Sequence, residues 1–107
     1  MKYRRTDEFK RDYKKLKPEH QNAFRDVVLE KFAPACDAWA TAAETKLPYV
    51  WPASLRVAEL KNTDRIMEMT WSFASPDGRT TFQFERREEE WLCTWRRIGD
   101  RGVYTSP

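Results

Sequence analysis

The chain has very few of the residues on which most enzyme mechanisms depend. Its 107 residues include one histidine, two cysteines and three glycines. A ribonuclease mechanism based on two histidines is therefore excluded. The single His20 is expected at the start of a helix, away from the sheet face, so serine and threonine nucleophiles also lack a histidine base. Two scattered cysteines do not make a zinc site, and three glycines do not build a glycine-rich phosphate loop. We expect neither a metal nor a cofactor.

Long apolar runs are also missing. No segment approaches the ~18 apolar residues that span a membrane, and the N-terminus lacks the apolar stretch of a secretory signal. Cys36 and Cys93 lie far apart, which is typical of buried free thiols in a reducing compartment, with a disulfide as the alternative. We expect a cytoplasmic protein with one domain, residues 1–107, and one core.

Positive charge is concentrated at the N-terminus. The whole chain carries only +3, whereas residues 1–17 carry +5. The basic residues there are Lys2, Arg4, Arg5, Lys10, Arg11, Lys14, Lys15 and Lys17. Such a surface fits a polyanionic partner or an acidic protein partner, and the alternative is an ordinary solvated helix face.

The first half of the chain has a helical pattern. Residues 2–5 predict a short edge strand, and Thr6 is a typical N-cap for a helix that continues to Leu16. Pro18 suits the first position of a second helix. That helix keeps one apolar phase through Phe24, Val28, Phe32, Ala35, Trp39 and Ala43. Pro34 lies inside it and predicts a kink or a short break.

The second half has the period-two pattern of strands. Residues 55–60 and 79–86 predict strands, and the alternation in residues 67–73 is a strong strand signature. Residues 75–78 form a typical turn sequence, and residues 91–98 predict the last long strand. The class is α+β, with two N-terminal helices packed on one face of an antiparallel sheet of about four to five strands.

A four-residue hairpin loop would set the register of this sheet. Trp71 would then face Phe82, and Thr70 would face Gln83. Because side chains alternate, one sheet face carries the apolar set Met69, Trp71, Phe82 and Phe84. The other face carries Glu68, Thr70, Ser72, Arg79, Thr81 and Gln83. We expect the helices on the apolar face and an open polar face, which is either a functional surface or simply solvated.

The C-terminal end holds the groups best suited to bind a phosphate. Residues 95–104, WRRIGDRGVY, run from an arginine-rich strand into a turn broken by glycine, where glycine bends the chain without strain. Guanidinium groups bind phosphate, and phenol rings stack on bases. Arg96 and Arg97 are expected on opposite faces, so at most one of them lines the site.

Cleavage of RNA without a metal requires a base for the 2′-hydroxyl, cations for the phosphate and an acid for the leaving oxygen. Glu68 can act as the base, Arg79 and Arg101 can hold the phosphate, and Tyr104 can donate a proton or stack on a base. The remaining expected RNA-binding residues are Lys61, Arg97, Thr70 and Thr81.

Each catalytic candidate also has an ordinary structural alternative. Glu68 can be a surface charge and Arg79 half of a cross-strand pair. Arg101 can be a solvated loop residue, and Tyr104 can pack on the edge of the core.

Five segments occur in an order and spacing that resembles a known family: residues 6–16, 55–57, 67–73, 77–82 and 95–104. The chain resembles, over almost its whole length, the RelE-like toxins of bacterial type II toxin–antitoxin pairs, close to an actinobacterial branch. The resemblance implies a small α+β fold, metal-independent cleavage of mRNA in the ribosomal decoding site, and a cognate antitoxin protein as partner.

The resemblance also implies roles for individual residues. Arg79 matches the family's arginine after the hairpin, and Arg101 matches the basic residue after the glycine turn. Tyr104 matches approximately the C-terminal tyrosine, and Glu68 lies near the position of an acidic base in some members.

The sequence departs from the family pattern in two places. Histidine is common where Arg101 stands, and Thr70 and Ser72 replace the sheet lysines of some members. Relatives of the ParE type share the fold and inhibit gyrase instead. A gyrase-inhibiting toxin without nuclease activity, or a non-toxic interaction module, is therefore the alternative function.

Overall fold

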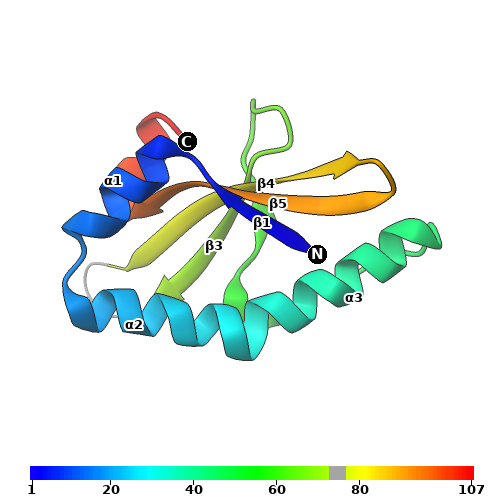
Figure 1. The fold of residues 1–107 in the computed structure, drawn as a ribbon, viewed down its shortest axis with the longest axis horizontal. Coiled ribbons are helices and arrows are strands. Elements are labelled where there is room, and N and C mark those ends of the chain that lie inside the picture. The colour runs from blue at the N-terminus through cyan, green and yellow to red at the C-terminus, as the bar shows by residue number, and fades with distance from the viewer. Residues whose placement is uncertain (73–76) are drawn as a thin grey trace.

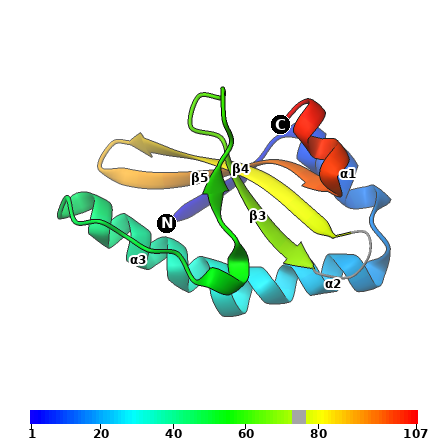
Figure 2. The ribbon, with the colours of Figure 1, turned by 180° about the vertical axis from the view of Figure 1, so that it is seen from behind.

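The computed structural model describes residues 1–72 and 77–107 and has an α+β architecture. A layer of helices lies along one face of a five-stranded sheet of order β1-β5-β4-β3-β2 (Figures 1 and 2). The strands are β1 Lys2–Arg5, β2 Ala58–Glu59, β3 Met67–Ser72, β4 Gly78–Arg87 and β5 Glu90–Gly99. The helices are α1 Asp7–Lys15, α2 Pro18–Val27, π-helical η1 Val28–Phe32 and α3 Ala33–Glu44, and the 3₁₀ turns are η2 Ala53–Leu55 and η3 Arg101–Thr105.

The predicted helix starts are confirmed. The hydroxyl of Thr6 accepts a hydrogen bond from the Phe9 N–H at 3.1 Å, and it donates to the carbonyl of Arg96 in β5 at 2.7 Å. Thr6 therefore caps α1 and also ties it to the sheet. Pro18 is the first residue of α2.

The predicted disturbance at Pro34 takes the form of a π-helical turn. Proline has no N–H and its ring crowds the carbonyl of Glu30, so the α-helical hydrogen bond between these residues does not form. The wider turn of η1 precedes Pro34, and the chain continues directly into α3. The long second helix of the sequence is thus α2, η1 and α3 in succession (Figure 1).

The sheet is mixed, which corrects the antiparallel expectation. β1 pairs with β5 in parallel, from Lys2 opposite Leu92 to Arg5 opposite Trp95. A pairing between opposite ends of the chain leaves no local pattern in the sequence. The expected strand at residues 55–60 is also shorter, because Leu55 is buried in η2 and Arg56 has a left-handed backbone with φ 48°.

The expected register is wrong by four residues, although the expected faces are right. Met67, rather than Trp71, lies opposite Phe82, and Thr70 lies opposite Arg79. A shift by an even number of residues leaves each side chain on its face. Met69, Trp71 and Phe82 are accordingly buried in the core. The expected turn at 75–78 lies partly outside the described residues.

The polar face is not open as expected. Thr70 and Thr81 are only 1% and 0% exposed, and the hydroxyl of Thr81 donates to the carbonyl of Pro107 at 3.0 Å. η3 lies on the side of the sheet opposite α2 and α3 (Figures 1 and 2). The C-terminal segment therefore covers the polar face over β4 and β5. None of the described helices is long and apolar enough to cross a membrane.

Candidate functional site

Three elements meet at the guanidinium of Arg79. In β4, Arg79 Nη2 donates to Asp77 Oδ2 at 3.1 Å and Arg79 Nη1 donates to the hydroxyl of Tyr104 in η3 at 3.4 Å. The carboxylate of Glu68 in β3 also lies close enough to the Tyr104 hydroxyl to affect its pKa. We call Arg79, Tyr104, Glu68 and Asp77 the Arg79 cluster. It brings together three of the four catalytic candidates from the sequence.

The phenol of the cluster keeps its proton at neutral pH. Burial raises the pKa of Tyr104 to about 12, and the nearby Glu68 carboxylate acts in the same direction, whereas Arg79 opposes the shift. Tyr104 therefore retains a proton that it can donate, and a carboxylate stands next to it.

Two buried polar atoms of the site have no hydrogen-bond partner among the described residues. They are Arg79 Nε and the hydroxyl oxygen of Thr70, and the two residues lie directly opposite each other in the β3–β4 ladder. Burying a polar group without a partner costs free energy. An N–H and a hydroxyl are both suited to a phosphate oxygen.

Two residues beside the cluster have structural roles: Asp100 caps η3, and Gly78 leaves room for the Trp71 ring. Asp100 caps η3 by accepting from the Gly102 N–H at 2.8 Å, and this cap orients the turn that carries Tyr104. A Cβ at Gly78 would lie 2.5 Å from the Trp71 ring. The glycine at this position is required by close packing. None of Gly78, Gly99 and Gly102 has a positive φ, so the expected relief of backbone strain by glycine at this corner is not observed.

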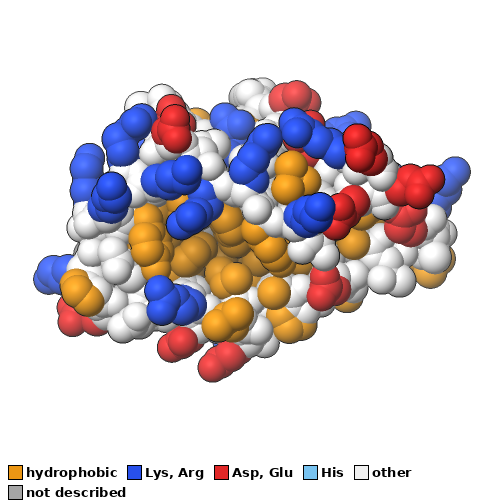
Figure 3. All heavy atoms as spheres, viewed as in Figure 1, with side chains coloured by type: hydrophobic (Ala, Val, Ile, Leu, Met, Phe, Trp, Pro, Cys, Tyr) orange, Lys and Arg blue, Asp and Glu red, His pale blue; other side chains and the backbone are white. Residues whose placement is uncertain are grey.

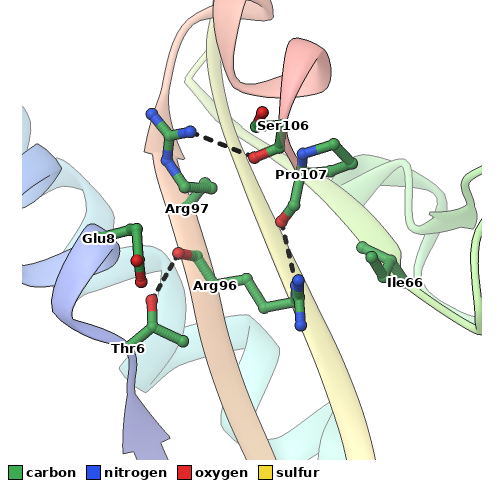
Figure 4. Close-up of a pocket in the computed structure, with 7 residues that line it drawn as sticks. All are labelled: Thr6, Glu8, Ile66, Arg96, Arg97, Ser106 and Pro107. Carbon is green, nitrogen blue, oxygen red and sulfur yellow. Dashed lines mark hydrogen bonds between the residues drawn. The ribbon is translucent and has the colours of Figure 1, made fainter.

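Arg96 and Arg97 lie on the same face, which corrects the expectation of opposite faces. The β4–β5 register shifts between Thr81, opposite Arg97, and Phe82, opposite Trp95. The extra residue of this β-bulge turns both arginines away from the core. Both line a cavity of about 370 Å³ (Figure 4).

The two arginines are already engaged within the protein. Arg97 Nε and Nη2 donate to the carboxylate of Asp12 at 2.6 and 3.2 Å, and Nη1 donates to the carbonyl of Ser106 at 3.1 Å. Arg96 Nε donates to the carbonyl of Pro107 at 3.0 Å (Figure 4). Arg97 thus joins α1 and the C-terminal segment to β5. Its positive charge is already paired with the carboxylate of Asp12.

The other expected binding residues are scattered. Thr81 is bonded to Pro107 beneath the C-terminal segment. The exposed side chains of Lys61 and Arg101 make no hydrogen bond or ion pair within the described ranges. Arg101 and Tyr104 are the first and fourth residues of η3, and side chains three apart in a 3₁₀ helix project from the same side. Arg101 therefore projects from the same side of η3 as Tyr104.

The sequence did not reveal two acidic partners, and it misplaced one histidine. Asp77 pairs with Arg79, two residues further along the chain, and Asp12 pairs with Arg97 although the two residues are far apart in the chain. His20 is expected away from the sheet, but the centroid of its ring lies 6.3 Å from the ring centroid of Trp71 in β3. It lines a cavity of about 160 Å³ that also includes Asp77 and Asp100.

No group of three or more His, Cys, Asp or Glu residues in the described part of the chain could hold a metal ion. Comparison with known proteins gives no significant match to a family model, to a curated protein or to a solved structure.

Proposed function

We propose that this chain is the toxin of a toxin–antitoxin pair, has a RelE-like fold and cuts mRNA at the ribosome without a metal. The observation that carries the proposal is the Arg79 cluster. The guanidinium of Arg79 in β4 and the carboxylate of Glu68 in β3 both lie close to the phenol of Tyr104 in η3. These are the three kinds of group that metal-free RNA cleavage requires.

The cluster supports a definite division of roles. Glu68 takes the proton of the 2′-hydroxyl, whose oxygen attacks the neighbouring phosphorus. Arg79 neutralises the charge that develops on the phosphoryl oxygens. Tyr104 protonates the departing 5′-oxygen, so the P–O5′ bond breaks and a 2′,3′-cyclic phosphate remains, which water opens to a 3′-phosphate.

Substrate must compete with protein groups for Arg79. The Arg79 side chain is only 12% exposed, and its guanidinium is paired with Asp77. A phosphate oxygen can take the place of the Asp77 carboxylate, and Arg79 Nε and the Thr70 hydroxyl are further donors. Arg101, exposed on the Tyr104 side of η3, supplies a second cation from the solvent side.

The proposed partner is a small acidic antitoxin. The basic residues of α1 draw an acidic chain by long-range attraction, while apolar contacts supply most of the affinity. The proposed place of action is the cytoplasm, where translating ribosomes are present.

Induced expression followed by primer extension on cellular mRNA tests the function. The proposal predicts new 5′ ends inside translated regions within minutes, and fragments whose 3′ ends carry a cyclic or terminal phosphate. Growth arrest with intact mRNA and damaged DNA would instead assign the chain to the gyrase inhibitors. Normal growth would assign it to the interaction modules.

A further inference from the structure

The sheet is open at β1. This strand is the edge of the sheet, and all four of its residues are exposed. In Figure 1, β1 crosses in front of β5, and α2 runs below it. The same view in Figure 3 shows a hollow below β1 in which apolar side chains reach the surface between Lys and Arg side chains.

The hollow is a groove between the sheet and the helix layer. It has a volume of about 260 Å³, and its lining includes Phe24, Leu29 and Trp95 together with Arg5 and Arg25. Leu29 is 66% exposed, which is unusual for a leucine that borders the core. We call this site the β1 groove. Contiguous exposed apolar surface with a polar rim marks interaction sites.

We propose that an extended, acidic segment of a second protein adds to the free edge of β1 as a sixth strand, with its apolar side chains in the β1 groove. The backbone geometry supports strand addition. The N–H of Thr6 donates to the carbonyl of Trp95 in β5, and backbone groups alternate in direction along a parallel strand. The N–H groups of Tyr3 and Arg5 consequently point away from β5, toward the open edge.

Side-chain alternation along β1 matches a partner strand with one apolar and one acidic face. Tyr3 stacks against Trp95 on the helix side, and Arg5 lines the groove on that side. Lys2 and Arg4 project to the other side of the sheet, where they reach Glu90 and Glu85. An added strand would therefore place every second residue in the groove.

The positive charges of Arg5 and Arg25 favour an acidic partner. Within residues 1–72 and 77–107, neither Arg5 nor Arg25 lies in an ion pair. A second copy of this chain would bring residues 2–5, KYRR, against the same basic sequence, and like charges opposite each other are destabilising. An acidic segment instead meets Arg5 and Arg25 with complementary charge. The inference does not rest on RNA cleavage, although under the proposed function the segment belongs to the antitoxin.

A synthetic peptide of about ten residues in which Glu alternates with Leu is a suitable probe, since strands usually have this length or less. Hydrogen exchange and calorimetric titration on the full chain should show saturable binding and slower exchange of the Tyr3 and Arg5 amides. A peptide with Lys in place of Glu should not bind.

Two variants of Arg5 separate the contribution of its backbone N–H to binding from that of its side-chain charge. Arg5→Pro removes the outward N–H, which an edge strand tolerates, and should abolish binding. Arg5→Ala keeps the N–H and should weaken binding by less than about tenfold, as expected for a rim charge. Leu29 is 66% exposed, so Leu29→Asp should leave the fold intact. It should weaken binding by about tenfold or more, and it gives a second test if Arg5→Pro does not fold.

Three results would overturn the proposal. The acidic peptide does not bind, it binds without protecting the β1 amides, or Leu29→Asp binds it as well as the unchanged protein. A concentration-dependent dimer that Leu29→Asp dissolves would assign the edge to a second copy and would also overturn the acidic partner.

Discussion

The hydroxyl of Tyr104 accepts from Arg79 Nη1 at 3.4 Å, although the two residues lie 25 positions apart. This contact joins the C-terminal turn η3 to the start of β4. It also places a phenol that stays protonated beside a cation suited to phosphate, and the carboxylate of Glu68 is close to the same phenol. The proposed chemistry follows from this relationship.

Tyr104→Phe should slow RNA cleavage by about 100-fold, because loss of a positioned proton donor has effects of this order. The ring remains, so the packing of η3 should be unchanged. Single-turnover cleavage of mRNA on ribosomes measures the effect. Tyr49→Phe, in the loop after α3, is the matched control and should cleave at the normal rate. Equal rates for both variants would remove Tyr104 from the reaction.

Protein stability should fall as the pH rises from about 10 to about 12. Burial raises the pKa of Tyr104 from 10.0 to about 12, so in this range the unfolded chain loses the tyrosine proton while the folded chain retains it. The free energy of unfolding must then decrease with pH. Burial raises the pKa of Tyr3 as well. Urea unfolding at several pH values should show the decline, and Tyr104→Phe should make it shallower. An unchanged slope would contradict the buried setting of Tyr104.

Gly78→Ala should destabilise the fold by about 1–3 kcal/mol, the usual cost of forcing a methyl group into a packed site. The new Cβ would lie 2.5 Å from the indole ring of Trp71, whereas a Cβ at Gly99 would lie 3.4 Å from Val103. Gly99→Ala is therefore the control and should cost clearly less. Chemical denaturation measures the free energy of unfolding of both variants. Equal stabilities would contradict the close packing at Gly78.

Asp12→Ala should cost about 1–3 kcal/mol of stability, the range for charge-assisted hydrogen bonds with limited solvent access. The Asp12 and Arg97 side chains are 13% and 27% exposed, and Asp12 also accepts from the Ile98 N–H. Lys2→Ala breaks the exposed pair with Glu90 and should change stability by less than about 1 kcal/mol. A loss no larger in Asp12→Ala than in Lys2→Ala would show that Arg97 does not hold α1 to the sheet.

Local patterns predicted the elements and their faces, and failed for contacts between distant segments. The alternation around Met69 and Trp71 determines which side chains point toward the helices, because a shift of four residues preserves the faces. It does not determine which residue lies opposite Phe82, since this depends on the hairpin connection. The parallel pairing of β1 with β5 joins opposite ends of the chain and has no periodic signal.

The candidate site was predicted in part for the same reasons. Arg79 and Glu68 lie on one face by alternation, and Tyr104 was matched through the resemblance to a family. The burial of Thr70 and the coverage of Thr81 by the C-terminal segment were missed, because residues 101–107 carry no helical or strand pattern. Asp12 was missed as the partner of Arg97 because the two residues are 85 positions apart.

The most direct test of the central claim is the cleavage rate of Arg79→Ala on ribosome-bound mRNA. A charge-assisted contact to a developing phosphate charge is worth ~2–4 kcal/mol, so the account predicts a rate lower by roughly 30- to 1000-fold. Arg87→Ala is the control and should cleave normally, since Arg87 lies at the far end of β4 and pairs only with the partly exposed Glu85 among the described residues. Circular dichroism should show both variants folded. A folded Arg79→Ala protein that cuts mRNA as fast as the Arg87→Ala control would contradict the account.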